Sequence, residues 1–94
     1  MIAAIATAIR GGKGREALDM IAEAQARLAG PLGGSLDRLD PGSVVSLLGA
    51  EKAKLHAKLL RLEAEARGSL GEVARGLALE ARADEIERLG GTTS

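Results

Sequence analysis

A helix–glycine turn–helix segment occurs twice in this chain. Residues 10–26 read RGGKGREALDMIAEAQA, and residues 67–83 read RGSLGEVARGLALEARA. An arginine, two glycines, an alanine and a closing Glu-Ala-x-Ala recur at the same spacing. The apolar positions of the preceding helix also correspond: Ile2, Ile5 and Ile9 with Leu59, Leu62 and Ala66. Self-similarity of this kind is typical of repeat architectures. The sequence therefore predicts two helical hairpins of the same design.

The apolar pattern predicts five helices, one of them short. The first, over residues 2–9, carries no charge, so we expect it to be buried, either between other helices or across a dimer interface. The second covers residues 15–29 and ends at a Gly-Pro pair, which leads into a turn over residues 30–34. Asp40 and Pro41 form a typical helix start, and the short helix that follows is expected to fill the space between the hairpins.

The last two helices form the second hairpin. The helix over residues 51–67 has a wide apolar face, as expected for a helix contacted on two sides. The segment 69–72 reads SLGE, a capping box, and predicts a final helix that runs to about residue 89. The side chains expected to face inward at its start are Leu70, Val73, Leu77 and Ala81. Gly76 lies inside this helix and indicates a close helix crossing.

These elements predict an all-α fold with a single helical domain over residues 1–89 and a flexible tail over residues 90–94. Two αα-hairpins are joined by a short linking helix. The chain contains no Phe, Trp or Tyr, so its core has to be built from aliphatic side chains. A core of this kind in 94 residues leaves a thin stability margin, and a second subunit would complete it.

The composition argues against several classes of function. Thirteen basic and thirteen acidic residues balance, whereas nucleic-acid surfaces need clustered positive charge. The chain has no cysteine, hence no disulfide and no thiolate zinc site, which fits a cytoplasmic protein. No apolar run reaches the ~20 residues that span a bilayer, so no membrane partner is expected. We expect no cofactor.

Three groups of residues are candidates for chemistry, and each has a simpler structural interpretation. Residues 11–14 read GGKG but lack the spacing and preceding strand of a phosphate loop, so they indicate an inter-helix turn. His56 is the single histidine and is expected on a helix surface or at an interface. Glu80, Asp84 and Glu87 share one side of the last helix and could chelate a cation, but a solvated acidic face is favoured. We therefore expect no enzymatic activity.

The hairpins resemble tetratricopeptide-repeat units, whose second helix follows a glycine turn and alternates small and large apolar residues. In the first unit Gly12, Ala17, Ile21 and Ala24 fit this pattern, with Pro31 near the closing proline. In the second unit only Gly68 and Leu77 fit. Residues 2–88 also resemble a group of small, uncharacterised bacterial tetratricopeptide-like proteins, through the segments EAL at 16–18 and AKLL at 57–60. The resemblance implies a helical-repeat fold and carries no functional residues.

The function that we expect is non-enzymatic: a protein–protein interaction or scaffold module that self-associates, as a homodimer, or binds an unidentified protein partner. Helical repeats bind their partners through apolar anchors. The residues predicted for the interface are Ile2, Ile5, Ile9, Leu55, Leu59, Leu79 and Ile86. The alternative is a small ligand- or metal-sensing regulatory module with His56 or the acidic side chains at its site.

Overall fold

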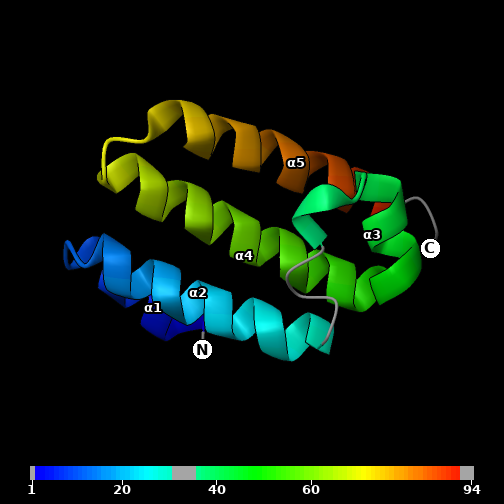
Figure 1. The fold of residues 1–94 in the computed structure, drawn as a ribbon, viewed down its shortest axis with the longest axis horizontal. Coiled ribbons are helices and arrows are strands. Elements are labelled where there is room, and N and C mark those ends of the chain that lie inside the picture. Colours follow the sequence, from blue (N-terminus) through cyan, green and yellow to red (C-terminus); the bar gives the residue numbers. More distant parts are fainter. Residues whose placement is uncertain (1, 31–35, 92–94) are drawn as a thin grey trace.

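The computed structural model describes residues 2–30 and 36–91, and this part of the chain is helical without strands. The elements are α1 (Ile2–Arg10), α2 (Gly14–Ala29), the 3-10 turn η2 (Leu36–Arg38), α3 (Pro41–Leu48), α4 (Ala50–Ser69) and α5 (Val73–Gly91). The predicted all-α fold with five helices is confirmed. Helices α1 and α2 form one hairpin, and α4 and α5 form the other (Figure 1).

Helix α4 is the central element of the fold. Helices α1 and α2 pack on one of its sides and α5 packs on the other (Figure 1). The short helix α3 contacts α4 and α5 at the end where α4 begins. The prediction that this helix fills the space between the hairpins is wrong, because α2 packs directly against α4 and leaves no room for a spacer.

The core consists of two apolar clusters, one on each side of α4. Leu59 joins the cluster with α1 and α2, whereas its neighbour Leu60 joins the cluster with α3 and α5. Adjacent helical residues point about 100° apart, so a helix that is buried on two sides needs apolar residues at consecutive positions. This double burial confirms the wide apolar face predicted for α4. The cluster between α4 and the pair α1 and α2 also contains Ile5, Ala17, Ile21, Ala24 and Ala66. The cluster between α4 and the pair α3 and α5 also contains Leu36, Val44, Ala53, Ala57, Ala83 and Ile86.

The start of α3 matches the sequence prediction, but the start of α5 does not. Asp40 caps α3: its Oδ2 accepts from the Ser43 amide at 3.2 Å and its Oδ1 accepts from the Ser43 hydroxyl at 2.6 Å, and these bonds lower the pKa of Asp40. Ser69 is the last residue of α4, and its hydroxyl donates to the Ala66 carbonyl. The predicted capping box is therefore wrong, because Ser69 closes α4 instead of opening α5.

Two predicted features at the ends of the chain also need correction. Helix α1 buries Ile5 but exposes Ala3, Ala4 and Thr7, because α1 packs only against α2 and α4 and keeps an open outer face. The predicted flexible tail was to begin at Gly90, yet α5 continues to Gly91 and Gly90 is buried. Residues 92–94 of the predicted tail and residues 31–34 of the turn predicted over residues 30–34 lie outside the described residues.

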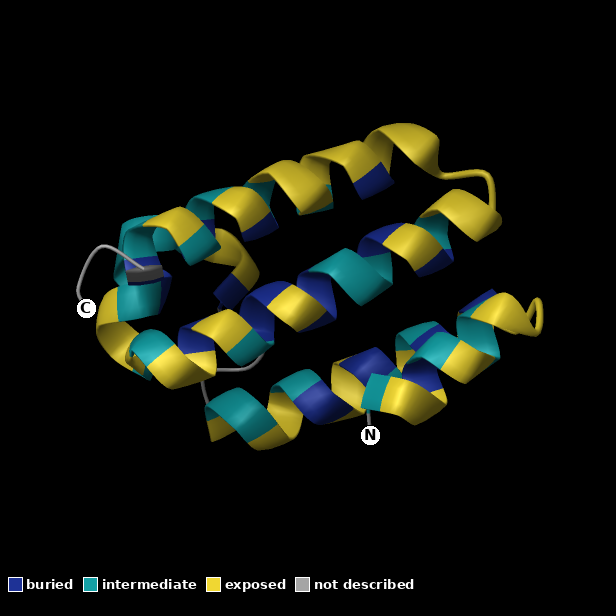
Figure 2. Ribbon diagram, turned by 180° about the vertical axis from the view of Figure 1, so that it is seen from behind, coloured by how far each residue is buried: buried dark blue, intermediate teal, exposed yellow. Residues whose placement is uncertain are grey.

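The first half of α5 presents an apolar face to solvent. Val73 is 60% exposed and Leu77 is 62% exposed, and Leu70 in the preceding turn is 40% exposed (Figure 2). The inward orientation predicted for these residues and for Ala81 is wrong. The opposite face of α5, which carries Gly76, Leu79, Ala83 and Ile86, packs against α4, and one helix cannot turn both of its apolar rows to the same neighbour.

Candidate functional site

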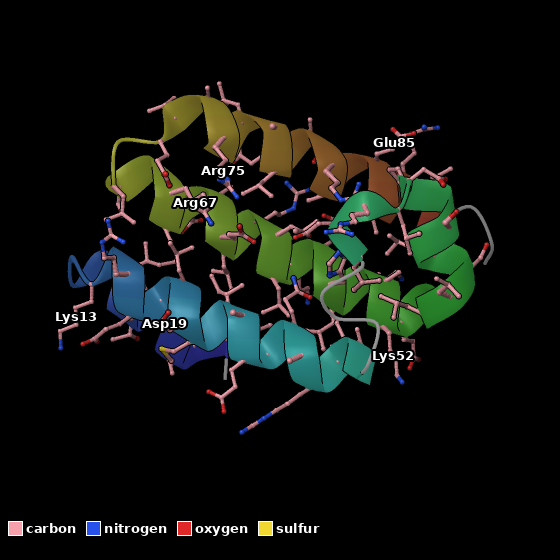
Figure 3. All side chains as sticks on the ribbon, in the orientation of Figure 1. Lys13, Asp19, Lys52, Arg67, Arg75 and Glu85 are labelled. Atoms are coloured by element: carbon pink, nitrogen blue, oxygen red, sulfur yellow. The ribbon has the colours of Figure 1, made fainter. Side chains whose placement is uncertain are left out.

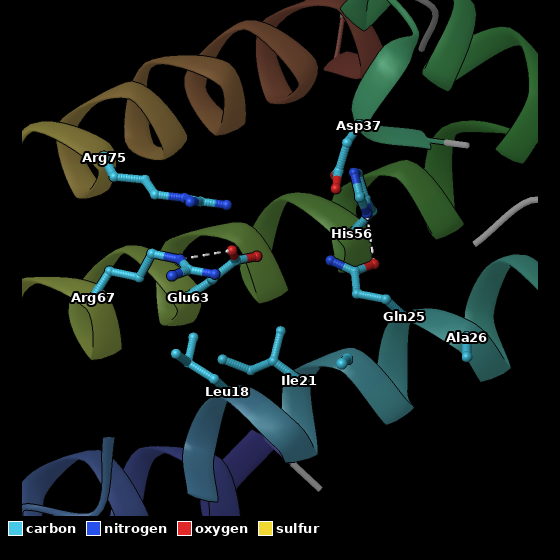
Figure 4. A pocket seen from close by; sticks show the side chains of 10 residues that line it. Leu18, Ile21, Gln25, Ala26, Asp37, His56, Glu63, Arg67 and Arg75 are labelled. Carbon is cyan, nitrogen blue, oxygen red and sulfur yellow. Dashed lines mark hydrogen bonds and ion pairs between the residues drawn. The ribbon is translucent and has the colours of Figure 1, made fainter. Parts of the chain in front are cut away.

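A groove runs over α4 between α2 and α5, because these two helices pack on opposite sides of α4. Its volume is about 330 Å³. One wall comes from α2, with Leu18 and Ile21 facing the space, and His56, Glu63 and Arg67 of α4 form the floor (Figure 4). The groove is thus apolar on one side and polar along its base.

His56 lies at one end of the groove floor and is only 1% exposed. Its Nδ1 lies 2.6 Å from Oε1 of Gln25, so the bond joins α4 to α2 (Figure 4). Because the amide oxygen can only accept, Nδ1 carries the proton, and Nε2 has no hydrogen-bond partner among the described residues. Burial lowers the pKa of His56 and the charge of Arg82 lowers it further, against the opposing effect of Asp37. The imidazole is therefore neutral at pH 7.

The buried neutral state of His56 makes stability depend on pH. Below the unfolded-state pKa of about 6.5, the unfolded chain binds a proton that the folded chain resists. We expect the free energy of unfolding to fall between pH 6.5 and 5, with a slope of at most ~1.4 kcal/mol per pH unit for one proton. Urea denaturation monitored by circular dichroism measures this slope. His56→Gln keeps a polar partner for Gln25 and should remove the slope; a flat wild-type profile would contradict the assignment.

Arginine side chains gather at the other end of the groove, near the turn that joins α4 to α5. Arg67 donates to Glu63 at 3.2 Å and to Glu72 at 2.8 Å. The hydrogen bond from Arg67 lowers the pKa of Glu72, and the charges of Arg67, Arg75 and Arg15 add to this effect. Arg75 extends over the groove close to Arg67 (Figures 3 and 4). Its side chain forms no hydrogen bond or ion pair in the described part of the chain, so its charge is available.

The acidic residues proposed from the sequence as a cation site belong to an ion-pair network. The Nη2 atom of Arg61 in α4 lies 2.5 Å from Oδ1 of Asp84 and 2.6 Å from Oε1 of Glu87. Glu80 is exposed on the same helix and takes no part in this network. No group of three or more potential metal ligands comes together within residues 2–30 and 36–91. Two of the three candidate carboxylates therefore serve to hold α5 on α4.

The residues predicted for an interface divide into two groups. Ile5, Leu59 and Ile86 are buried in the chain's own core, so they offer no surface to a partner. The other four are half-buried: Ile2, Ile9, Leu55 and Leu79. The most exposed large apolar side chains are different ones, namely Val73, Leu77 and Leu47, with Leu70 less exposed. The sequence carried a signal for Val73 and Leu77, since α5 has two apolar rows and only one can face α4.

Comparisons with protein-family models, with curated proteins and with solved structures found no match to the chain. Within the described residues, none of the helices combines the length and hydropathy needed to cross a bilayer. The function has to be argued from the groove and from the exposed face of α5.

Proposed function

We propose that this protein is a non-enzymatic interaction module that forms a homodimer through the outer face of α5. The observation that carries the proposal is the pair of large apolar side chains on the outer face of α5, Val73 and Leu77, which are 60% and 62% exposed. Ala74, Ala78 and Ala81 are exposed around them. Contiguous exposed apolar surface of this kind typically marks an interaction site. Alanine at the contact lets two helix axes approach to about 8 Å.

A second copy is the occupant that a single apolar patch favours. A two-fold symmetric interface uses the same patch on both subunits, so a single patch is sufficient. Ala74, Leu77 and Ala81 share a helix face with Asp84 further along α5. In an antiparallel pair centred between Ala74 and Leu77, Asp84 of each copy lies beyond the start of the other α5. The ion pair between Asp84 and Arg61 therefore stays outside the contact.

Sedimentation velocity and light scattering over a concentration series test the dimer. We expect Leu77→Glu to weaken dimerisation by more than about tenfold, because the interface would then bury a carboxylate without a partner. Leu47→Glu is the matched control, since Leu47 is 54% exposed but lies on α3, at the opposite end of α5. A monomeric wild type at about 100 μM, or equal effects of the two variants, would contradict the proposal.

We also propose that the two hairpins represent a short tetratricopeptide-like array and that the protein acts in the cytoplasm. The antiparallel packing within each hairpin and the direct contact between α2 and α4 support the array. The absence of cysteine fits a reducing compartment.

A further inference from the structure

Four charged side chains line the groove between α2 and α5, and only two of them form an ion pair with each other. Arg67 and Glu63 form an ion pair at 3.2 Å. The side chains of Arg75 and Asp37 form no hydrogen bond or ion pair within the described residues. They lie at opposite ends of the groove, and both point into it (Figure 4). The groove therefore has an unengaged cation at one end and an unengaged anion at the other.

At its end of the groove, the Asp37 carboxylate is the charged group that lines the space, since Arg82 is not among the lining residues. His56 lies beside Asp37 and is neutral at pH 7. The Nε2 atom of His56 is closed off from solvent, so the Asp37 carboxylate is the group that a ligand meets. The Arg82 guanidinium is held by the carbonyl oxygens of Leu36 and Leu39, at 2.6 and 2.7 Å.

Between the two charged ends, the wall formed by α2 is mainly apolar. It consists of Leu18, Ile21, Ala22 and Ala26, interrupted by Gln25. Leu18 and Ala26 are eight residues apart, which is about 12 Å along a helix. An extended peptide covers ~3.3 Å per residue, so a segment of about four residues matches the length of this wall. The volume of about 330 Å³ lies in the range of small-molecule sites.

We propose that this groove binds a short zwitterionic peptide with apolar side chains. The carboxylate of the peptide lies at Arg75, where a planar guanidinium can donate two parallel hydrogen bonds. Its ammonium group lies at Asp37, and its side chains lie against Leu18, Ala22 and Ala26. A simple anion would leave Asp37 unmatched, and a simple cation would leave Arg75 unmatched. The site uses a different surface from the outer face of α5 and does not depend on dimerisation.

Calorimetric and NMR titrations with the tetrapeptide alanyl-leucyl-leucyl-alanine test the proposal. We expect saturable binding with resonance shifts confined to the groove. Acetylation of the amino terminus removes the cation, and amidation of the carboxyl terminus removes the anion. Each modification should weaken binding about tenfold, the effect of losing one charged contact.

Two variants test whether Arg75 binds the carboxylate of the peptide and whether Asp37 binds its ammonium group. Arg75→Gln should weaken binding of the free peptide and abolish the effect of amidation, while leaving the effect of acetylation. Asp37→Asn should show the converse pattern. Arg38→Gln is the control, since Arg38 is next to Asp37 but outside the groove lining. It should change neither the affinity of the free peptide nor the effect of amidation or acetylation. Binding should persist in Leu77→Glu. The proposal is overturned by an absence of saturable binding up to about 10 mM peptide, by equal affinities of the free and capped peptides, or by identical responses of Arg75→Gln and Arg38→Gln.

Discussion

Gly76→Ala is expected to destabilise the protein by about 1–3 kcal/mol, although alanine is the better helix former. Gly76 lies where α5 crosses α4, and a Cβ atom there would lie 2.9 Å from the carbonyl oxygen of Ala64. This atom belongs to the α4 backbone, so the clash is relieved only by moving one helix away from the other. Urea unfolding of the variant, monitored by circular dichroism, measures the loss.

Gly68→Ala provides the control for Gly76→Ala. Gly68 lies in the last turn of α4, and a Cβ added there meets no atom within 4 Å. Only the helix propensity acts at this position, so we expect a gain of up to about 1 kcal/mol. If both alanine variants are stabilising, α4 and α5 do not approach at Gly76 as closely as the 2.9 Å distance to the Ala64 carbonyl oxygen requires.

Arg82→Ala is expected to cost about 2 kcal/mol, because hydrogen bonds from a charged donor to buried acceptors contribute more than neutral ones. One Nη2 atom of Arg82 donates to the carbonyl oxygens of Leu36 and Leu39, and these two bonds fix η2 on α5. Leu36 is a buried core residue, so its displacement would also open the cluster between α3, α4 and α5. Thermal and urea unfolding measure the overall cost, and hydrogen exchange of η2 reports the local loosening.

Arg75→Ala is the matched control for Arg82→Ala. Arg75 lies on the same helix seven residues earlier, and its side chain forms no hydrogen bond or ion pair in the described part of the chain. Its loss should change stability by less than about 0.5 kcal/mol. Arg82→Ala should also raise the pKa of His56, since the charge of Arg82 lowers it. Equal stabilities of the two variants would contradict the tethering role.

The sequence predicted the helices well and the surfaces poorly. The duplicated segment and the glycine turns were sufficient to place two hairpins, and Asp40 was sufficient to place the start of α3. These signals depend on residues close together in the sequence, so they can be interpreted without knowledge of the packing. The outward orientation of Leu77 was missed because periodicity identifies an apolar row but not the neighbour that covers it.

The groove was beyond prediction from the sequence for a different reason. Its charged groups come from three elements that are far apart along the chain: Asp37 in η2, Arg67 in α4 and Arg75 in α5. No spacing rule brings them together, since the groove exists only because α2 and α5 pack on opposite sides of α4. His56 was identified as a candidate, but its bond to Gln25 depends on the same packing.

Pulsed electron paramagnetic resonance is the most direct measurement of the proposed dimer. The chain has no cysteine, so a spin label can be attached at one introduced thiol. Two exposed positions serve for the comparison: Ala78→Cys on the outer face of α5, and Ser46→Cys on α3. In an antiparallel α5 pair, the labels at residue 78 are close together and those at residue 46 are far apart. A short intermolecular distance at 78 with a long one at 46 is expected; no dipolar coupling at 78, or a shorter distance at 46, would contradict self-association through α5.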